Sequence, residues 1–384
     1  MEMEQHIKEI INQGDDSGNG MVVRFELPSG LEIIGLPTKN YYGGHWDLGP
    51  TWNYAVLGDK PFLVDAGRFG QGQNLVDMMA SAGIKSKDLE FVLISHGHED
   101  HDGGLAELVN STRLKVKAHR VYERLIRKYP AWAPVGHKAD FPAKCWHCPM
   151  PESFYAKNCL GYHKVLQALE IDPIGDGENV LAPGIRTHHL PGHSPDCVAV
   201  LLAGEAIIVG DIVLPDITPW PTREEMFDEI ADVVKPLDLR PNQIFGLDRY
   251  IKSLKKLGEI AAEHPDLLVL PAHRFYFKGK WNGLQLTQRV GELLEHHVQR
   301  CAAIIEILQT GPKTAAEVAR EHFEERLLEG FGSIMADNEI VSHCEFLAAC
   351  GDVVSIEPNH YEATGTGTFE KSILSTPADS PFFP

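Results

Sequence analysis

Four short segments of this chain, predicted as strands and in three cases apolar runs, each lead into a residue that can ligate a metal ion. The segments and the residues that follow them are 91–95 with His96, 185–190 with His193, 206–210 with Asp211, and 267–270 with His273. Short apolar runs of this kind are typical of buried strands. The pattern therefore predicts a fold of strands and helices in which polar groups collect at strand ends.

The loop that follows the first segment, in the sequence Ser95-His-Gly-His-Glu-Asp-His101, contains four candidate ligands: His96, His98, Asp100 and His101. Their spacing cannot place all four on one face of a helix, but a tight loop after a strand can bring them together. Imidazole nitrogen and carboxylate oxygen suit Zn²⁺, and also Fe and Mn. The alternative is a solvated polar loop, which the same pattern at three other strand ends disfavours.

The order of these residues, HxHxDH followed by His, Asp and His, resembles the metallo-β-lactamase superfamily. Further similar segments are 62–67 (FLVDAG), 190–194 (LPGHS), 209–212 (VGDI) and 270–274 (LPAHR), so that the resemblance covers about residues 20–280. It implies an α/β (α+β) fold, the αββα sandwich of that family. A helical, winged-helix-like C-terminal module is similar to the glyoxalase II-like and lactamase-β-like branch.

The resemblance also implies a centre of two divalent ions, most simply Zn²⁺, with Fe or Mn as alternatives. Residue by residue, His96, His98 and His193 would hold the first ion, Asp100, His101 and His273 the second, and Asp211 would bridge them. Asp65 matches a position that supports the ligands from outside, which fits the general need to orient metal-bound histidines. The alternative for Asp65 is an aspartate of a strand-end turn.

Two neighbouring dications lower the pKa of a bridging water, so hydroxide becomes available as a nucleophile near neutral pH. One ion can polarise the scissile carbonyl or phosphoryl oxygen, and the other can stabilise the departing group. No serine or cysteine nucleophile is then required. We expect Asp100 and Asp211 to be catalytic, with Asp100 also orienting the water.

The length of 384 residues suits one catalytic domain with an appended module. We expect a catalytic domain over 1–285, which includes an insertion or cap over 120–180, then a helical winged-helix-like module over 286–364 and a polar tail over 365–384. Within the module, Thr314 followed by Glu317 predicts a capping box at the start of a helix.

Weaker signals lie in and near the insertion. Cys145, Cys148, Cys159 and His163 have a spacing that could bind a structural zinc ion or form a redox-sensitive bridge. Buried cysteines that act as small apolar residues are the alternative. Trp146, Tyr276 and Phe277 are candidates for the substrate pocket, and packing within the insertion is an equally good explanation for Trp146.

Charge and composition restrict the substrate. The net charge of −19 opposes binding to nucleic-acid phosphates or to an anionic membrane. From Phe331 onwards the chain has one basic residue, Lys371, against eight acidic ones, which disfavours a nuclease. We therefore expect a small-molecule substrate, no nucleic-acid or membrane partner, and a C-terminal module that packs on the chain or forms a homodimer.

The function that combines these features is hydrolysis of a small ester or thioester, of the acyl-CoA or acyl-glutathione type. The alternatives are a phosphodiesterase or ribonuclease of the same superfamily, and a sensor that binds a ligand at the metal centre without turnover. Seven cysteines, an acidic N-terminus and no long apolar stretch indicate a protein of the reducing cytoplasm.

Overall fold

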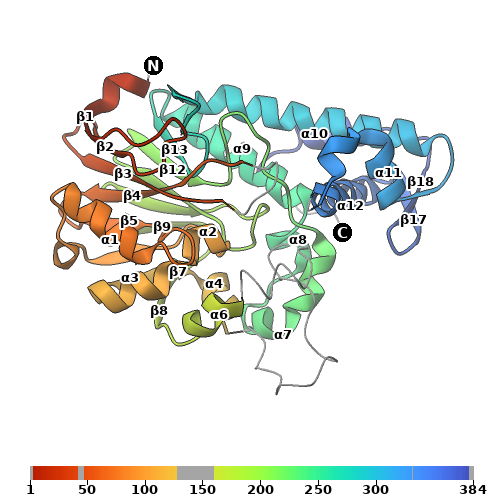
Figure 1. Cartoon of the computed structure of the whole chain (residues 1–384). Coiled ribbons are helices and arrows are strands. Elements are labelled where there is room, and N and C mark those ends of the chain that lie inside the picture. Colours follow the sequence, from red (N-terminus) through yellow and green to blue (C-terminus); the bar gives the residue numbers. More distant parts are fainter. Residues whose placement is uncertain (1–2, 42–46, 128–159, 331, 380–384) are drawn as a thin grey trace.

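The computed structural model describes residues 3–41, 47–127, 160–330 and 332–379, and it contains two facing β-sheets with helices on their outer sides (Figure 1). The first sheet has its strands in sequence order: β1 (Ile7–Asn12), β2 (Val22–Glu26), β3 (Glu32–Thr38), β4 (Thr51–Leu57), β5 (Phe62–Val64), β6 (Phe91–Leu93), β7 (Lys115–His119) and β8 (Ile171–Ile174). Strands β1 to β5 pair antiparallel, and β5 to β8 pair parallel.

The second sheet packs its inner face against the first. Its order is β13 (Leu268–Pro271), β12 (Ala206–Gly210), β11 (Val198–Leu202), β10 (Ile185–His189) and β9 (Glu178–Ala182). The core between the sheets includes Phe25, Tyr54, Val200 and Leu270, all fully or almost fully buried. Strands covered on both faces must be apolar throughout, which is why β11 and β12 lack an alternating pattern.

Helices cover the outer face of each sheet, which completes an αββα sandwich. On the first sheet they are α1 (Gly72–Ser81), α3 (Leu105–Thr112) and α4 (Arg120–Leu125), and on the second α9 (Leu247–Glu263) and α10 (Leu286–Leu308). Shorter helices are α2 (Glu99–Asp102), α6 (Leu160–Leu166), α7 (Ala231–Val234) and α8 (Pro241–Ile244). The fold implied by the family resemblance is thus confirmed.

The segment 120–180 is less separate from the sandwich than the sequence predicted. Helix α4 packs on the first sheet, and β8 extends that sheet by pairing parallel to β7. Both ends of the range thus belong to the sandwich, and a cap role for the part between them stays a prediction. Pro173 in the middle of β8 obscured the strand signal, because proline is disfavoured inside sheets and is tolerated at an edge such as this one.

Several sequence-based candidates lie outside the described residues. Cys145, Trp146, Cys148 and Cys159 all fall within 128–159, so the predicted third metal site and the aromatic pocket residue stay predictions. His163, their proposed partner, is a buried residue of α6.

Helices followed by a β-hairpin form the C-terminal module. After α10 come β16 (Lys313–Thr314), α11 (Ala315–His322), α12 (Gly332–Cys350), β17 (Val353–Glu357) and β18 (His360–Ala363). The predicted capping box is present, since the Thr314 hydroxyl accepts from the Glu317 N–H and the Glu317 carboxylate accepts from the Thr314 N–H. Figure 1 shows α10 running from the sandwich to this module. None of the described helices is both long and apolar enough to span a bilayer.

The predicted polar tail from residue 365 contains a short helix that packs on the module. Residues Phe369–Ser375 form helix α13, and the side chains of Phe369 and Ile373 are buried against the module. The Asp352 carboxylate accepts hydrogen bonds from the backbone N–H groups of Thr368 and Phe369 at the start of this helix. Two apolar residues in a short polar segment gave too weak a periodic signal to predict it.

Glu345 of α12 gives a prediction for stability against pH. Burial raises the pKa of its carboxyl to about 7, although the carboxylate also accepts hydrogen bonds from the backbone N–H groups of Glu224 and Glu225, which lower it. Because the pKa in the folded state exceeds that of the unfolded chain, the contribution of Glu345 to stability is fully present below about pH 4.5 and is lost as the pH rises through 7.

Glu345→Gln should remove this pH dependence. We expect the stability of the wild type, relative to the variant, to fall by on the order of 2 kcal/mol between pH 5 and pH 8, after allowing for partial exposure of the side chain. Urea denaturation of both proteins at the two pH values measures the difference. Parallel pH dependence in the two proteins would contradict the assignment.

Candidate metal centre

The loops after five strands meet at one edge of the sandwich. Asp65 follows β5, and His96 to His101 follow β6, which pairs parallel to β5. His193, Asp211 and His273 follow β10, β12 and β13 in the second sheet. The carboxyl ends of neighbouring parallel strands lie at the same edge of a sheet, so the sequence pattern becomes a spatial cluster.

All seven predicted ligands belong to two groups of closely spaced side chains. Candidate donor atoms of His96, His98, His193 and Asp211 lie within 4.8 Å of one another, and the same holds for Asp100, His101 and His273. In the first group, the Nδ1 atom of His98 lies 3.0 Å from His96 Nε2 and 3.2 Å from His193 Nε2. These are spacings that ligands of a common ion can adopt.

Asp211 faces both groups. One carboxylate oxygen, Oδ2, lies 3.7 Å from His193 Nε2 and 3.5 Å from His101 Nε2, while Oδ1 lies 3.4 Å from His273 Nε2. A single carboxylate between two groups of imidazoles is the arrangement required of a bridging ligand.

In three of these histidines the Nδ1 atom, the ring nitrogen that points away from the cluster, faces an acceptor. His101 Nδ1 lies 2.9 Å from Asp65 Oδ2, His193 Nδ1 lies 3.1 Å from the Trp220 carbonyl, and His273 Nδ1 lies 3.2 Å from the Pro50 carbonyl. A carbonyl can only accept, so Nδ1 of His193 and His273 must carry the proton. In the neutral ring, Nε2 then carries the lone pair and faces the cluster, which is the tautomer needed to bind a metal.

Asp65 connects two of the loops. Its backbone has a φ of 65°, a left-handed conformation that aspartate and asparagine tolerate better than most residues. Its carboxylate accepts from the Ser95 N–H at 2.7 Å and the Ser95 hydroxyl at 2.8 Å, besides facing His101. Asp65 thus lies where the family resemblance placed a supporting residue.

Asp65→Asn should weaken metal binding by roughly 10- to 100-fold, because one acceptor oxygen becomes a donor while the backbone conformation stays accessible. Competition with a chromophoric chelator measures the affinity. Asp59→Asn, in the exposed turn after β4, is the matched control. Equal affinity in both variants would show that Asp65 has no role in orienting His101.

Two residues that sequence reasoning missed orient Asp100. Its Oδ2 atom accepts hydrogen bonds from Asn40 Nδ2 at 2.8 Å and from the Thr51 hydroxyl at 3.0 Å, and all three side chains are buried. Asn40 and Thr51 lie about 50 to 60 positions earlier in the chain. No local motif marks them, since they reach the site only through the pairing of β3 with β4.

Electrostatics supports cation binding at this cluster. Burial raises the pKa of the Asp211 carboxyl, but the nearby His273 and His101 outweigh it and hold that pKa well below its usual range. Conversely, burial lowers the pKa of His273, but Asp211 and Asp100 raise it to about 9. The carboxylates thus require positive charge beside them, and divalent cations would supply it.

The donor set fits two metal ions by a further observation. The Nε2 atoms of His101 and His273 and the Oδ1 atom of Asp211 are buried and make no hydrogen bond to the described residues. Buried polar atoms are nearly always hydrogen-bonded or coordinated. Ligation of divalent ions would satisfy all three.

Two predicted pocket residues have ring contacts within the protein. Phe277, in the short strand β14 (Tyr276–Phe277), is buried and lies under the Arg274 guanidinium, 4.0 Å from ring centroid to Cζ. The Tyr276 ring contacts Trp281 of β15 (Lys280–Trp281) edge to face at 5.0 Å between centroids. A role of either ring in the substrate pocket stays a prediction.

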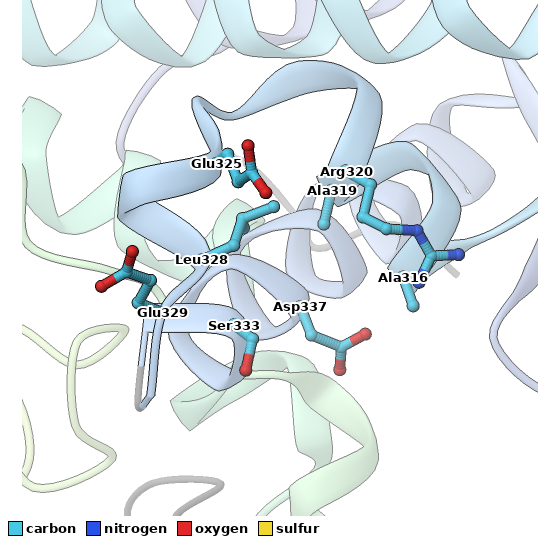
Figure 2. Close-up of a pocket in the computed structure, with 8 residues that line it drawn as sticks. All are labelled: Ala316, Ala319, Arg320, Glu325, Leu328, Glu329, Ser333 and Asp337. Atoms are coloured by element: carbon cyan, nitrogen blue, oxygen red, sulfur yellow. The ribbon is translucent and has the colours of Figure 1, made fainter.

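A cavity of about 670 Å³ lies in the C-terminal module, away from this cluster. Figure 2 shows it between α11 and α12, where Arg320 and Asp337 are among the lining residues. None of the seven candidate ligands lines it. The candidate site is therefore defined by the convergent histidines and aspartates.

Two other groups of potential ligands among the described residues are His119, Asp176 and His189, and His296, His297 and Glu339. In the first, the two rings stack with centroids 3.5 Å apart and planes 15° apart, so their in-plane lone pairs cannot converge on one ion. In the second, the Arg300 guanidinium lies 3.7 Å from the Glu339 carboxylate and offsets its charge. We assign a metal to neither group.

An αββα sandwich with clustered histidines and aspartates at one edge defines a class of proteins composed mostly of metal-dependent hydrolases. The profile of the metallo-beta-lactamase superfamily matches residues 46–273. The chain belongs to this superfamily, as its sequence motifs predicted.

Individual relatives are distant. Beta-lactamase-like protein 2 homolog of Drosophila melanogaster is 23% identical over 190 residues, which are 49% of this chain and 54% of that protein, so the match spans about half of the relative. N-acyl homoserine lactonase of Bacillus cereus is 23% identical over 243 residues, covering 57% of this chain and 79% of the lactonase. A beta-lactamase domain protein from Burkholderia ambifaria superposes with a TM-score of 0.63 at 19% identity, over 94% of this chain and 98% of that one.

Proposed function

We propose that the protein hydrolyses a small ester or thioester at a centre of two divalent ions, most simply Zn²⁺, held by the seven predicted ligands. The observation that supports this proposal is the convergence of five imidazoles and two carboxylates on one buried edge of the sandwich. When bound, such ions supply Lewis acidity and an acidified water.

The residues of the chain have separate parts in this proposal. His96, His98 and His193 form one half of the cluster, and Asp211 faces both halves. The Oδ2 atom of Asp100 is fixed by two hydrogen bonds and lies 3.1 Å from His273 Nε2 and 3.6 Å from His101 Nε2, so this oxygen faces the other two members of its group. Burial of these groups excludes bulk water and strengthens their electrostatic effect on a bound carbonyl.

An acyl substrate is supported by one relative and by charge. The Bacillus cereus protein is named as a lactonase, and a lactone is a cyclic ester whose reacting carbonyl resembles that of a thioester. A phosphodiester is the alternative. The net charge of −19 and the acidic C-terminal module disfavour polyanionic nucleic acids, so we propose a small molecule as substrate.

A substrate panel tests the proposal. The metal-replete protein is assayed with an acyl-CoA, an S-acyl glutathione, an N-acyl homoserine lactone and bis(p-nitrophenyl) phosphate. Turnover of an ester, lactone or thioester in preference to the phosphate is expected. Preference for the phosphate would favour the phosphodiesterase alternative, and binding without turnover of any compound would favour a sensor.

Location and assembly belong to this proposal as well. Cys197, Cys301, Cys344 and Cys350 are free thiols in the described chain, which is compatible with the reducing cytoplasm that we propose. We also propose that the acidic module packs on its own chain or contacts a second copy, and size measurement in solution distinguishes these two arrangements.

A further inference from the structure

Residues 220–225, here named the linking segment, lie between the loop that carries His193 and helix α12 of the C-terminal module. On the side of the loop, the Trp220 carbonyl accepts a hydrogen bond from His193 Nδ1 at 3.1 Å. Thr222 donates to the Gly192 carbonyl through its backbone N–H at 2.7 Å and its hydroxyl at 2.8 Å. The linking segment therefore holds His193 and the residue before it.

On its other side the linking segment is held by Asn338 of α12. The Asn338 side chain accepts from Arg223 Nε at 3.0 Å and donates to the Pro221 carbonyl at 3.1 Å. Arg223 also donates from Nη2 to Asp337 Oδ2 at 2.6 Å. Asn338 is 1% exposed and Arg223 is 6% exposed, so water competes poorly for these bonds.

Glu345 of α12 extends this contact by two more bonds. Its carboxylate accepts from the backbone N–H groups of Glu224 and Glu225 at 2.8 and 3.1 Å. Along α12, Asp337, Asn338 and Glu345 thus contact the linking segment, through side chains to backbone and to one arginine. This array fixes the path of a segment that is neither helix nor strand from Trp220 to Arg223.

The loop of His193 has little room to adjust by itself. Gly192 has a φ of 136°, and a Cβ atom at this position would lie 2.4 Å from the Cα of Tyr250 in α9. The Thr222 hydroxyl also accepts from the Gly246 N–H at 3.2 Å, just before that helix. A shift of the linking segment would therefore displace the acceptor of His193 while the loop stays confined by α9.

We propose that α12 positions His193 through the linking segment, and that Asn338 and Arg223 are positioning residues for the metal centre. This inference rests on the proposed function of the centre. The C-terminal module thereby becomes part of the site. Asn338 lies 145 positions after His193 in the chain, yet it donates to the carbonyl of Pro221, the residue next to Trp220, and the Trp220 carbonyl is the partner of His193.

The competing explanation is that these bonds only attach the module to the sandwich. Asn338→Ala distinguishes the two explanations in the full-length protein, because it removes both hydrogen bonds to the linking segment. Ile340→Ala is the matched control, since Ile340 is a buried core residue of the same helix. Both variants should lower the melting temperature, but only the first should alter the centre.

The readouts are the visible spectrum of the cobalt-substituted protein and the rate of metal loss to a chelator. We expect Asn338→Ala to change the spectrum and to weaken metal binding by roughly 10- to 100-fold, the range for groups that orient metal-bound histidines. Ile340→Ala should match the wild type in both. Asn338→Asp keeps the acceptor for Arg223 but loses the donor to Pro221, so an intermediate effect is expected.

Two results would overturn different claims. A wild-type spectrum and wild-type metal retention in both Asn338 variants would overturn this inference and leave the proposed function intact. A wild-type protein that binds no cobalt would overturn the proposed function itself.

Discussion

Asp211→Ala should reduce turnover by on the order of 10³-fold or more while the fold is retained. Asp211 faces both groups of imidazoles, so its loss removes a shared ligand and the negative charge that balances two cations. Several kcal/mol of transition-state stabilisation depend on such ions, which corresponds to this factor in rate. His98→Ala should have a similar effect, because His98 Nδ1 lies between two other imidazoles.

The control for Asp211→Ala is Asp216→Ala. Asp216 lies five positions later, is largely exposed and pairs with Arg274 at 3.3 Å. Steady-state kinetics on the best ester or thioester of the panel, with circular dichroism to verify folding, measures the effect. Near wild-type turnover in folded Asp211→Ala protein would contradict the hydrolase assignment.

Removing the metal ions should destabilise the protein strongly. A ligand present at about 1,000 times its dissociation constant stabilises the folded state by about 4 kcal/mol. For a domain of this size that corresponds to a fall in melting temperature of roughly 10 °C on chelation. The physical cause is that the buried carboxylates of Asp100 and Asp211 lose their counter-charge.

Thermal unfolding with and without chelator, followed by readdition of Zn²⁺, measures this change. The melting temperature of Asp211→Ala should respond much less to chelator, because its centre is already incomplete. An identical response in the two proteins would place the bound metal elsewhere, for example at the undescribed Cys145 and Cys148.

The seven candidate ligands could be predicted from sequence because they lie in loops directly after short strands. Each of the four ligand-bearing loops follows a short strand, and three of these strands are apolar, so local pattern and residue type together mark the site. The order of the motif then identified the family and with it the sandwich. Asp65 was found in the same way, at the end of β5.

The groups around the ligands could not be predicted. Asn40 follows β3 and Thr51 begins β4, far from Asp100 in the sequence, and the acceptors of His193 and His273 are backbone carbonyls, which no side-chain pattern reveals. The same holds for Asn338, whose bonds to the linking segment depend on how the module packs. Long-range contacts of this kind are set by tertiary structure rather than by local sequence.

Titration of metal-free protein with Zn²⁺, followed by ester or thioester turnover, tests the central claim most directly. We expect no turnover without metal and a rise that reaches its plateau at about two equivalents per chain, as a two-ion centre requires. Full turnover in the metal-free protein would contradict it.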